Sequence, residues 1–565
     1  MTAVATQAGA PFSVTIDWYG IDWRKVKRNV RRLQVRIVKA IEAGRWGKVK
    51  ALQYLLTRSF SGKALAVKRV TENRGKRTAG VDGEIWETPR KKAEGIGNLR
   101  QHGYRAKPLK RRYIPKPNGK QRPLGIPTMK DRAMQAIYKL AEDPVVETTG
   151  DPNSYGFRKE RSSADAIAQC FLCLRQKTSP GVVLEGDIRG CFDNFSHEWM
   201  LKNIPIEKGI LTQWLKAGYI DKGVFNRTEA GSPQGGIISP DLANMTLDGL
   251  EELIETRPHR GTKRQAKLHM IRFADDFIIT GSSKELLEED ILPGVVEFMG
   301  ERGLELSEEK TRITRIEDGF DFLGQTLRKH KGKLIIKPSK KSVRGLMKKI
   351  RQTIRENQQV SAGVLIVQLN PIIRGWANYH RHAVSKKTFS KVDHDIHQTL
   401  WKWARRRHRK KSARWVKKKY FRTYDGRKWV FYGQVSQADE TKQEVRLVSA
   451  AQTPTRWHVK VKSKANPYDP KWESYFERRL QTKMMFDLRS KQKLLRLWQS
   501  QDGTCPVCRE KITIETDWEN HHIEWRVHGG PDTAENRVLL HPTCHKQVHS
   551  RGITVLKPRP TQGRS

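Results

Sequence analysis

Apolar residues recur every three or four positions along several stretches of the chain, with polar residues between them. Such spacing places the apolar side chains on one face of a helix. It predicts helices over residues 21–41, 131–141, 163–176 and 284–302. The first of these helices carries many Lys and Arg residues at its other positions, whereas residues 1–20 show no pattern and are expected to be loosely ordered.

Short apolar runs that end at turn residues predict strands. The run VVLEGDI at 182–188 ends in a carboxylate, and KLHMIRFADDFIITGSS at 267–283 reads as strand, two-residue acidic turn and strand. Residues 108–127 have PNGK at their centre and basic residues on both arms, so a basic hairpin is expected. Residues 338–420 then read as helical and intensely basic, and residues 421–470 mix strand-like runs with basic loops.

The charge of the chain narrows the class of partner. Its 565 residues include 109 Lys and Arg against 60 Asp and Glu, which gives a formal net charge of +49. Because this charge is spread over the whole length, a long nucleic acid is a better match than an acidic membrane surface. With 37% hydrophobic residues the chain can form several cores, which excludes a wholly disordered tail.

Other classes are excluded by what the sequence lacks. No apolar run approaches the ~18–20 residues of a membrane span, and the first ten residues show no secretory signal pattern. Six Cys residues are too few for a disulfide scaffold. We therefore expect a cytoplasmic protein without a membrane partner, associated with the nucleoid when it is bound to DNA.

Adjacent carboxylates at Asp275 and Asp276 stand between two apolar strands. Two such groups at a tight turn repel each other, and divalent cations offset that cost. A third carboxylate, Asp187, ends the earlier strand run and can meet the pair only through tertiary structure. If the strands are neighbours, the three carboxylates can hold Mg²⁺ for a phosphoryl transfer. The alternative is a solvated acidic turn without function.

Cys and His residues cluster at metal-ligand spacing after residue 490. Cys505 and Cys508 form a C-x-x-C pair, and His541 and Cys544 form a second pair with the same spacing, which suits structural Zn²⁺. An alternative is a zinc finger that only binds DNA, but a finger needs no further set of polar residues. Such a further set is present: His521, His522, Asn536, His545 and His549.

Between residues 401 and 420 there are eleven Lys or Arg residues and no acid. Solvated helical faces usually alternate in sign, and this one does not. We assign the run to nucleic-acid contacts of the kind that set affinity and salt dependence rather than sequence preference. The alternative is a solvated helical face.

Several motifs of the first 330 residues resemble those of reverse transcriptases in kind and in order. The chain departs from the family at Phe273, where Tyr is usual. The motifs are Lys116 and Arg122 in the basic hairpin, YGFR at 155–158, Asp187 with Phe192, SPQGG at 232–236 with Gln234, FADD at 273–276, Lys310, and FLG at 322–324.

This resemblance implies a role for each candidate residue. The three Asp residues would be catalytic and hold Mg²⁺. Phe192 would be the steric gate against a ribose 2′-hydroxyl, and Gln234 would help to position the incoming nucleotide. Lys310 stands in the place of a general acid for pyrophosphate. Lys116 and Arg122 match cations that contact the triphosphate of a dNTP.

Two further resemblances cover the rest of the chain. The segment IIRGWANYHRH at 372–382 resembles the maturase domain of group II intron proteins, which serves as the polymerase thumb. The C-terminal residues resemble the HNH nuclease motif. That motif implies His522 as the general base, Asn536 as the residue that orients it, and a catalytic divalent cation on three ligands: His521, His545 and His549. His541 is then a candidate fourth zinc ligand.

Together these motifs resemble the multifunctional proteins encoded by bacterial group II introns. The implied fold is multidomain α+β: a right-hand polymerase with fingers and palm, an α-helical thumb, a basic DNA-binding segment and a ββα-metal domain. The expected boundaries are 1–85 for an RNA-binding extension, 86–335 for fingers and palm, 336–405 for the maturase domain or thumb, 406–489 for the basic DNA-binding region and 490–565 for the zinc-containing HNH domain.

The family implies three linked activities. The protein binds its intron RNA and assists splicing, cuts target double-stranded DNA, and copies the lariat RNA from the new primer with dNTPs. Two alternatives remain: a polymerase-only enzyme of the retron type, and a non-enzymatic splicing factor with a decayed polymerase site. The thumb motif and the HNH motif count against the first, and the three Asp residues count against the second.

Overall fold

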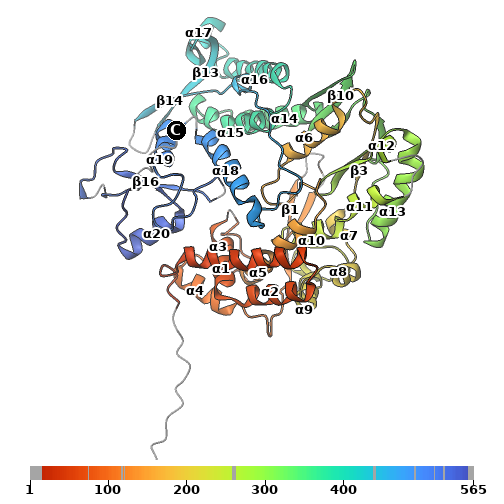
Figure 1. The fold of residues 1–565 in the computed structure, drawn as a ribbon. Coiled ribbons are helices and arrows are strands. Elements are labelled where there is room, and N and C mark those ends of the chain that lie inside the picture. The colour runs from red at the N-terminus through yellow and green to blue at the C-terminus, as the bar shows by residue number, and fades with distance from the viewer. Residues whose placement is uncertain are drawn as a thin grey trace, which may run out of the picture.

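A computed structural model describes residues 16–73, 75–115, 119, 121–257, 263–436, 441–488, 491–514, 516–525 and 528–557. Figure 1 shows a lower body formed by the first part of the chain, a helical upper part, and a small C-terminal domain beside both. Among the described residues no helix has the length and apolar character that a bilayer crossing demands.

The N-terminal helices form one side of the lower body. The first helix begins after Asp22, whose side chain accepts a hydrogen bond from the Lys25 backbone and so caps the first turn. Trp18 is only 3% exposed and packs edge-on against Trp23, so the expectation of loose order is wrong at that position. The helices are α1 (Trp23–Glu42), α2 (Trp46–Arg58), α3 (Phe60–Glu72), α4 (Pro89–Asn98) and the buried α5 (Met129–Thr149).

Two sheets complete the lower body. The predicted basic hairpin is β1 and β2, and together with β4 and β5 it forms the fingers sheet in the order β2-β1-β4-β5. The palm sheet has the order β6-β7-β3-β8. The strands are β1 (Leu109–Pro115), β2 (Gln121–Ile126), β3 (Val182–Asp187), β4 (Tyr219–Asp221), β5 (Val224–Asn226), β6 (His269–Phe273), β7 (Asp276–Gly281) and β8 (Arg312–Arg315).

Helices cover the palm sheet and share a core with it. The helix predicted over 284–302 is present, but its first part, η1, is a π-helix. The helices are α6 (Ser163–Leu174), α7 (Cys191–Asn194), α8 (His197–Asn203), α9 (Lys208–Leu215), α10 (Ser239–Leu247), α11 (Leu250–Thr256), α12 (Lys263–Ala266), η1 (Leu286–Ile291) and α13 (Leu292–Glu301). One core joins Trp18 and α3 to the palm residue Leu304, so the boundary expected at residue 85 lies inside packed structure.

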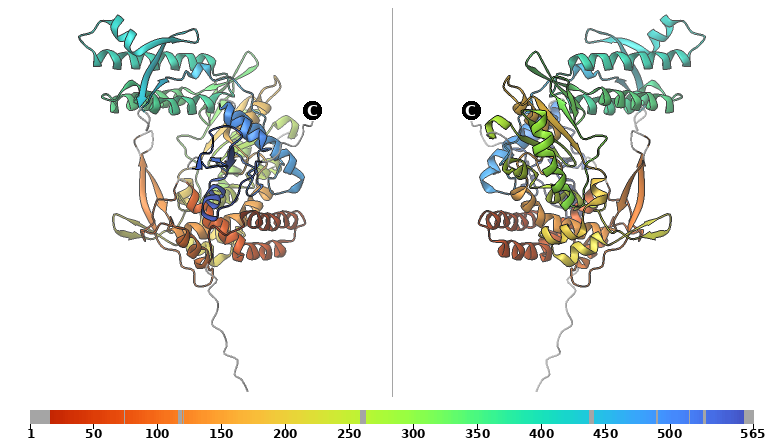
Figure 2. Two further views of the ribbon diagram at one scale, coloured as in Figure 1. Left: turned by 90° about the vertical axis from the view of Figure 1, so that its left-hand side faces the viewer. Right: turned by 90° about the vertical axis from the view of Figure 1, so that its right-hand side faces the viewer.

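The thumb lies above the fingers hairpin in the side views of Figure 2. A small sheet in the order β11-β10-β9 connects it to the palm. The elements of this sheet and of the thumb are β9 (Phe320–Phe322), β10 (Gln325–His330), β11 (Lys333–Pro338), α14 (Lys340–Glu356), α15 (Ala362–His380), α16 (Lys386–Arg407), α17 (Ala413–Tyr420), β12 (Phe421–Tyr424), β13 (Arg427–Ser436), β14 (Lys442–Arg446) and η2 (Ala450–Gln452).

The segment expected to be a separate DNA-binding region, 406–489, divides between two cores. Val416, Phe431 and Ala450 pack with the thumb helices, so the boundary expected at residue 405 falls within the thumb core. Val461 and Phe476 pack instead with the palm. The reason is that the apolar side chains of this basic segment are buried against the neighbouring domains while its cations stay outside.

The chain after the thumb runs back along the palm and ends in the C-terminal domain. Val461 N donates a 2.7 Å hydrogen bond to Asp165, and the basic helix α18 is tied to the palm by the Lys483–Glu160 ion pair at 2.8 Å. The elements are η3 (Pro470–Trp472), α18 (Glu473–Leu488), α19 (Gln492–Ser500), β15 (Glu519–His522), β16 (Arg537–Leu540) and α20 (Pro542–Arg551).

Candidate active sites

Three carboxylates meet at one end of the palm sheet. β3 and β7 pair antiparallel, with Asp187 directly opposite Asp276. Phe273 pairs with Asp276 across the connection between β6 and β7. The turn is therefore Ala274–Asp275 rather than the acidic pair that the sequence predicted, and Asp276 begins the next strand.

A close backbone approach supports this turn. Ala274 has a φ of 58°, in the left-handed region. A Cβ added at Gly156, in the YGFR motif, would lie 2.2 Å from the backbone nitrogen of Ala274, so only glycine fits there. Beneath the turn the guanidinium of Arg272 is fully buried and paired with Asp248. The YGFR motif thus holds the acidic turn in position through its glycine.

The carboxylates destabilise one another in their charged forms. Burial, together with repulsion from Asp275 and Asp187, raises the pKa of Asp276 to about 6. Burial and the charge of Asp187 also raise the pKa of Asp275. The Lys310 ammonium donates a 2.7 Å hydrogen bond to Asp187, which raises the pKa of Lys310. Such a cluster of repelling oxygens is a donor set for hard divalent cations.

The nucleotide-binding candidates surround this end of the sheet. The Phe192 ring packs edge-on against Phe157, with centroids 6.3 Å apart. The SPQGG loop joins the fingers to the palm: Gly125 N donates to the Gln234 carbonyl at 2.7 Å, and Ser232 N donates to the Phe192 carbonyl at 2.7 Å.

One of the two fingers cations, Arg122, lies close to the palm carboxylates. Arg122 on β2 lies near enough to Asp275 to lower the pKa of that carboxyl. Lys116, the other predicted triphosphate contact, lies outside the described residues.

The four predicted zinc ligands come together in the C-terminal domain. Their ligand atoms all lie within 4.8 Å of one another, and all four side chains are buried. His541 Nδ1 lies 3.3 Å from Cys508 Sγ. His541 immediately precedes α20 and Cys544 lies in its first turn, whereas the other pair comes from the loop after α19. The set is Cys505, Cys508, His541 and Cys544.

A second cluster unites three imidazoles, with ligand nitrogens within 4.8 Å of one another. His545 and His549 lie on one face of α20, and their Nε2 atoms are 3.1 Å apart. His521 comes from β15; its Nε2 is buried without a hydrogen-bond partner among the described residues. Burial and the two neighbouring imidazoles lower the pKa of His521 to about 4, so it is neutral at pH 7 and can serve as a metal ligand.

Two carboxylates that the sequence analysis missed orient these histidines. Glu519 Oε2 lies 2.6 Å from Nδ1 of His545, which leaves Nε2 toward the cluster. Asp532 Oδ1 lies 2.8 Å from Nε2 of His522, which leaves Nδ1 of that ring as the candidate base. The sequence carried a signal for Glu519, since it stands two residues before His521 on the same strand face, but none for Asp532.

The Asn536 side chain forms its hydrogen bonds with the loop before it. Its side chain accepts from Glu524 N at 2.8 Å and donates to the carbonyls of Glu524 and Pro531. These three bonds close the loop that carries Asp532. The Asn536 side chain is thus bonded to the loop whose Asp532 contacts His522.

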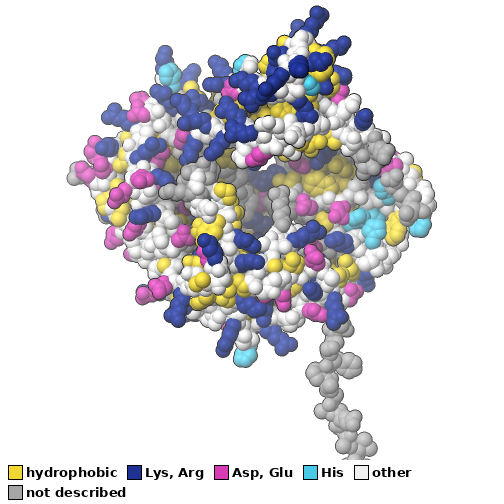
Figure 3. All heavy atoms as spheres, turned by 180° about the vertical axis from the view of Figure 1, so that it is seen from behind, with side chains coloured by type: hydrophobic (Ala, Val, Ile, Leu, Met, Phe, Trp, Pro, Cys, Tyr) yellow, Lys and Arg dark blue, Asp and Glu magenta, His cyan; other side chains and the backbone are white. Residues whose placement is uncertain are grey.

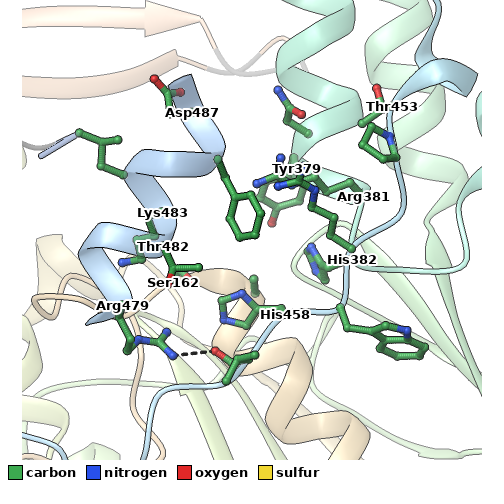
Figure 4. A pocket seen from close by; sticks show the side chains of 18 of the residues that line it. Ser162, Tyr379, Arg381, His382, Thr453, His458, Arg479, Thr482, Lys483 and Asp487 are labelled. Atoms are coloured by element: carbon green, nitrogen blue, oxygen red, sulfur yellow. Dashed lines mark hydrogen bonds between the residues drawn. The ribbon is translucent and has the colours of Figure 1, made fainter. Parts of the chain in front are cut away.

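A basic cavity of about 1600 Å³ lies where the palm, the thumb, α18 and the C-terminal domain meet. In Figure 4, Tyr379, Arg381 and His382 of the thumb face Arg479 and Lys483 of α18 across the cavity. The cations on its lining outnumber the acids: they are Arg374, Arg381, Arg456, Arg478, Arg479, Lys483 and Lys491, against Asp487 and Asp517.

Four family models match the chain in succession. The N-terminal domain of reverse transcriptase matches residues 18–99, and the reverse transcriptase (RNA-dependent DNA polymerase) model matches residues 114–327. The group II intron maturase-specific domain matches residues 343–421, and the HNH endonuclease model matches residues 505–551.

Curated relatives are also found. The protein YkfC of Escherichia coli K12 is 34% identical over 260 residues, which is 40% of this chain and 68% of YkfC. The group II intron-encoded protein LtrA of Lactococcus lactis subsp. cremoris is 29% identical over 328 residues, 47% of this chain and 54% of LtrA. The match thus spans about half the length of LtrA.

Among solved structures, a telomerase from Candida albicans aligns with a TM-score of 0.32 and 11% identity, covering 56% of this chain and 67% of the telomerase. The family models agree in order with the geometry described above, from the palm carboxylates to the imidazole cluster. The chain belongs to the family of group II intron-encoded proteins and carries reverse transcriptase, maturase and HNH endonuclease domains.

Proposed function

We propose that this chain supports the mobility of a group II intron. It binds the lariat intron RNA and assists splicing, cuts target double-stranded DNA with its HNH domain, and uses the new 3′ end to prime DNA synthesis on the intron RNA with dNTPs. The observation that carries the proposal is the register of Asp187 opposite Asp276, beside Asp275 and Lys310, in the same chain as the imidazole cluster.

In the polymerase site the side chains of the protein bind the metal ions, position the incoming nucleotide and donate a proton. Asp187, Asp275 and Asp276 would hold Mg²⁺, which stabilises the charge on the attacking and leaving oxygens. Lys310, already protonated beside Asp187, is placed to give a proton to pyrophosphate as it leaves. The Phe192 ring and the loop that carries Gln234 form the floor for the sugar and base.

In the nuclease site, His521, His545 and His549 would hold a divalent cation that stabilises the phosphate in the transition state. His522 takes the proton of the attacking water at Nδ1, while Asp532 holds its other nitrogen. The four-ligand cluster would hold Zn²⁺ as a structural ion, because all four ligands are buried and four protein ligands complete a tetrahedral site.

The basic surfaces support the binding of both nucleic acids. In Figure 3 the molecule is hollowed between the lower body and the thumb, and Lys and Arg side chains gather over the thumb. The cavity at the junction of thumb and C-terminal domain adds seven Lys and Arg side chains next to exposed aromatics such as Trp457, which is 80% exposed. Cations and open rings together suit unpaired nucleic acid.

Primer extension on an RNA template tests the proposal. The purified chain with Mg²⁺ and dNTPs is compared with the double variant Asp275→Ala, Asp276→Ala. We expect extension by the wild type, none by the variant, and equal binding of the intron RNA by both. Absence of extension by the wild type at every salt concentration and template, with RNA binding retained, would favour the splicing factor with a decayed polymerase site.

A further inference from the structure

A cavity of about 760 Å³ lies in the N-terminal part of the molecule and, of the residues named in the sites above, includes only Asp248, the partner of Arg272. It is lined by residues of α2 and α5, by the segment 202–208 from the end of α8 to the start of α9, and by Met245 and Asp248. The residues of α5 on its lining, among them Tyr138, Glu142 and Val145, are spaced three or four apart. The volume is in the range of about 300–1,000 Å³ typical of small-ligand sites.

The floor of this cavity holds two incompletely paired carboxyl groups. Glu142 is 1% exposed, and its Oε1 accepts a 2.8 Å hydrogen bond from Gln53. Its Oε2 is buried with no hydrogen-bond partner among the described residues, and the same holds for Oδ2 of Asp248. Because buried polar atoms are nearly always paired, these two oxygens indicate a ligand with hydrogen-bonding groups along one edge.

The wall and rim specify the rest of the ligand. Trp46 and Tyr54 on α2 are large aromatic side chains that are 42% and 57% exposed. The rim carries Lys50, Lys202 and Lys208, all exposed. A flat ring with a polar edge fits the floor and the face of Tyr54 that the Arg58 guanidinium, 3.6 Å from the ring centroid, does not cover. An anionic group fits the lysines.

We propose that this cavity binds a nucleotide, with its base between the α2 aromatics and Glu142 and its phosphate at the lysines of the rim. A polyamine would match the carboxyl groups but not the lysines, and an apolar peptide would leave the buried oxygens unpaired. The source of the nucleotide rests on the proposed function: it is an unpaired nucleotide of the intron RNA. A free nucleotide has the same chemistry.

Equilibrium dialysis with radiolabelled AMP, GMP, CMP and UMP, without Mg²⁺, tests the free-nucleotide source in the full-length protein. Ultraviolet crosslinking to intron RNA that carries 4-thiouridine tests the RNA source. The variants are Tyr54→Ala and Glu142→Leu. Leu55→Ala is the matched control, because Leu55 is the neighbouring residue of α2, is 52% exposed and does not line the cavity.

We expect Tyr54→Ala and Glu142→Leu to weaken nucleotide binding or crosslinking at α2 about tenfold, as loss of one stacked base does, and Leu55→Ala to leave both unchanged. Primer extension on a generic template should be equal in all variants. Binding of a monophosphate assigns a free nucleotide, and crosslinking alone assigns an RNA base. Neither signal, or signals equal in every variant, overturns the proposal. Wild-type protein that binds no intron RNA would instead refute the proposed function.

Glu142→Gln separates a failure to fold from a loss of the ligand. This variant keeps the shape of the side chain and an oxygen for Gln53, so it should keep the thermal unfolding temperature of the wild type. If Glu142→Leu unfolds, the Tyr54→Ala and Leu55→Ala pair decides the outcome, since both side chains are exposed.

Discussion

At the scale of single residues, Gly156 shows how a motif outside the carboxylates controls them. Its missing side chain lets the YGFR backbone lie against the turn Ala274–Asp275. We expect Gly156→Ala to lower the rate of primer extension by about 10²-fold, because the added methyl displaces the turn and a 1 Å misplacement at a reacting centre has about that effect. Steady-state extension assays measure it.

Gly181→Ala is the matched control, because a Cβ at Gly181, just before β3, meets no atom within 4 Å. It should extend primers as the wild type does, and the HNH activity of both variants should be unchanged. Full polymerase activity of Gly156→Ala would show that the turn tolerates displacement.

His380 makes the thumb sensitive to acid. The side chain is fully buried, with Nε2 2.9 Å from Ser342 Oγ, and burial followed by the neighbouring His382 lowers its pKa to about 4. In the unfolded chain the pKa of this imidazole is about 6.5, so below that pH the unfolded chain binds a proton that the folded chain binds only near pH 4. The free energy of unfolding therefore decreases as the pH falls from 6.5 to 4. At pH 5 the loss is about 2 kcal/mol.

Thermal unfolding of the wild type and of His380→Gln at pH 7.5 and pH 5 measures how much of the acid-induced loss of stability is due to His380. We expect the variant to lose less stability than the wild type over that interval. The same loss in both proteins would assign the acid sensitivity to other groups, of which His382 is one, since burial also lowers its pKa to about 4.

The residues of the candidate sites were predictable from the sequence where they lie a few positions apart on a single element. His545 and His549 share a helix face, and the two C-x-x-C-like pairs are local. The sequence indicated Asp187 as a partner of the acidic turn only if the strand that carries Asp187 lies beside the strand of the turn. The pairing of β3 with β7 meets this condition. Asp532 was not predictable, because the loop that places it is closed by hydrogen bonds from the Asn536 side chain to backbone groups.

At the scale of elements, helical periodicity predicted α1, short apolar runs predicted the palm strands, and the PNGK turn predicted the basic hairpin, because each of these signals is local. It could not predict that Val416 and Phe431 pack into the thumb core, since those contacts join segments far apart in sequence. Charge dominates the composition of the segment 406–452, and this concealed its apolar positions. The basic run is therefore the outer face of the thumb unit.

The cations of α17 and of the turn before it carry a prediction about salt. Arg409, Lys410 and Arg414 are exposed, and each is a candidate phosphate contact. If all three contact duplex DNA, replacing them with Gln lowers the slope of log K against log salt by about 2.7, since each contact contributes about 0.9. Titrations between 50 and 200 mM salt, about the range over which such slopes are measured, give the value.

A variant that exchanges Lys and Arg at the same three positions keeps the charge and should keep the slope. An unchanged slope in the Gln variant would show that this face points away from DNA.

At the scale of the whole molecule, the C-terminal domain rests on the first helices of the chain. Gln547 on α20 donates to the carbonyls of Tyr19 and Ile21, at 2.9 and 3.0 Å, and Thr543 donates to Glu72. The chain that leads there runs along the palm. The nuclease is thus held near the N-terminal helices, an arrangement that no local pattern in the sequence indicates.

Zinc should control this domain alone, because its core, which includes Leu497, Val538 and Val548, is separate from those of the palm and thumb. We expect Cys505→Ser to release zinc, to open residues 491–557 to proteases and to abolish DNA cleavage, while primer extension persists. Cys173→Ser is the control: Cys173 lies on α6 outside both clusters and should keep zinc, protease resistance and cleavage. Loss of primer extension in Cys505→Ser would show instead that the contacts of α20 with the segment before α1 and with α3 stabilise the polymerase, and that the two enzymes of the chain fold as one unit.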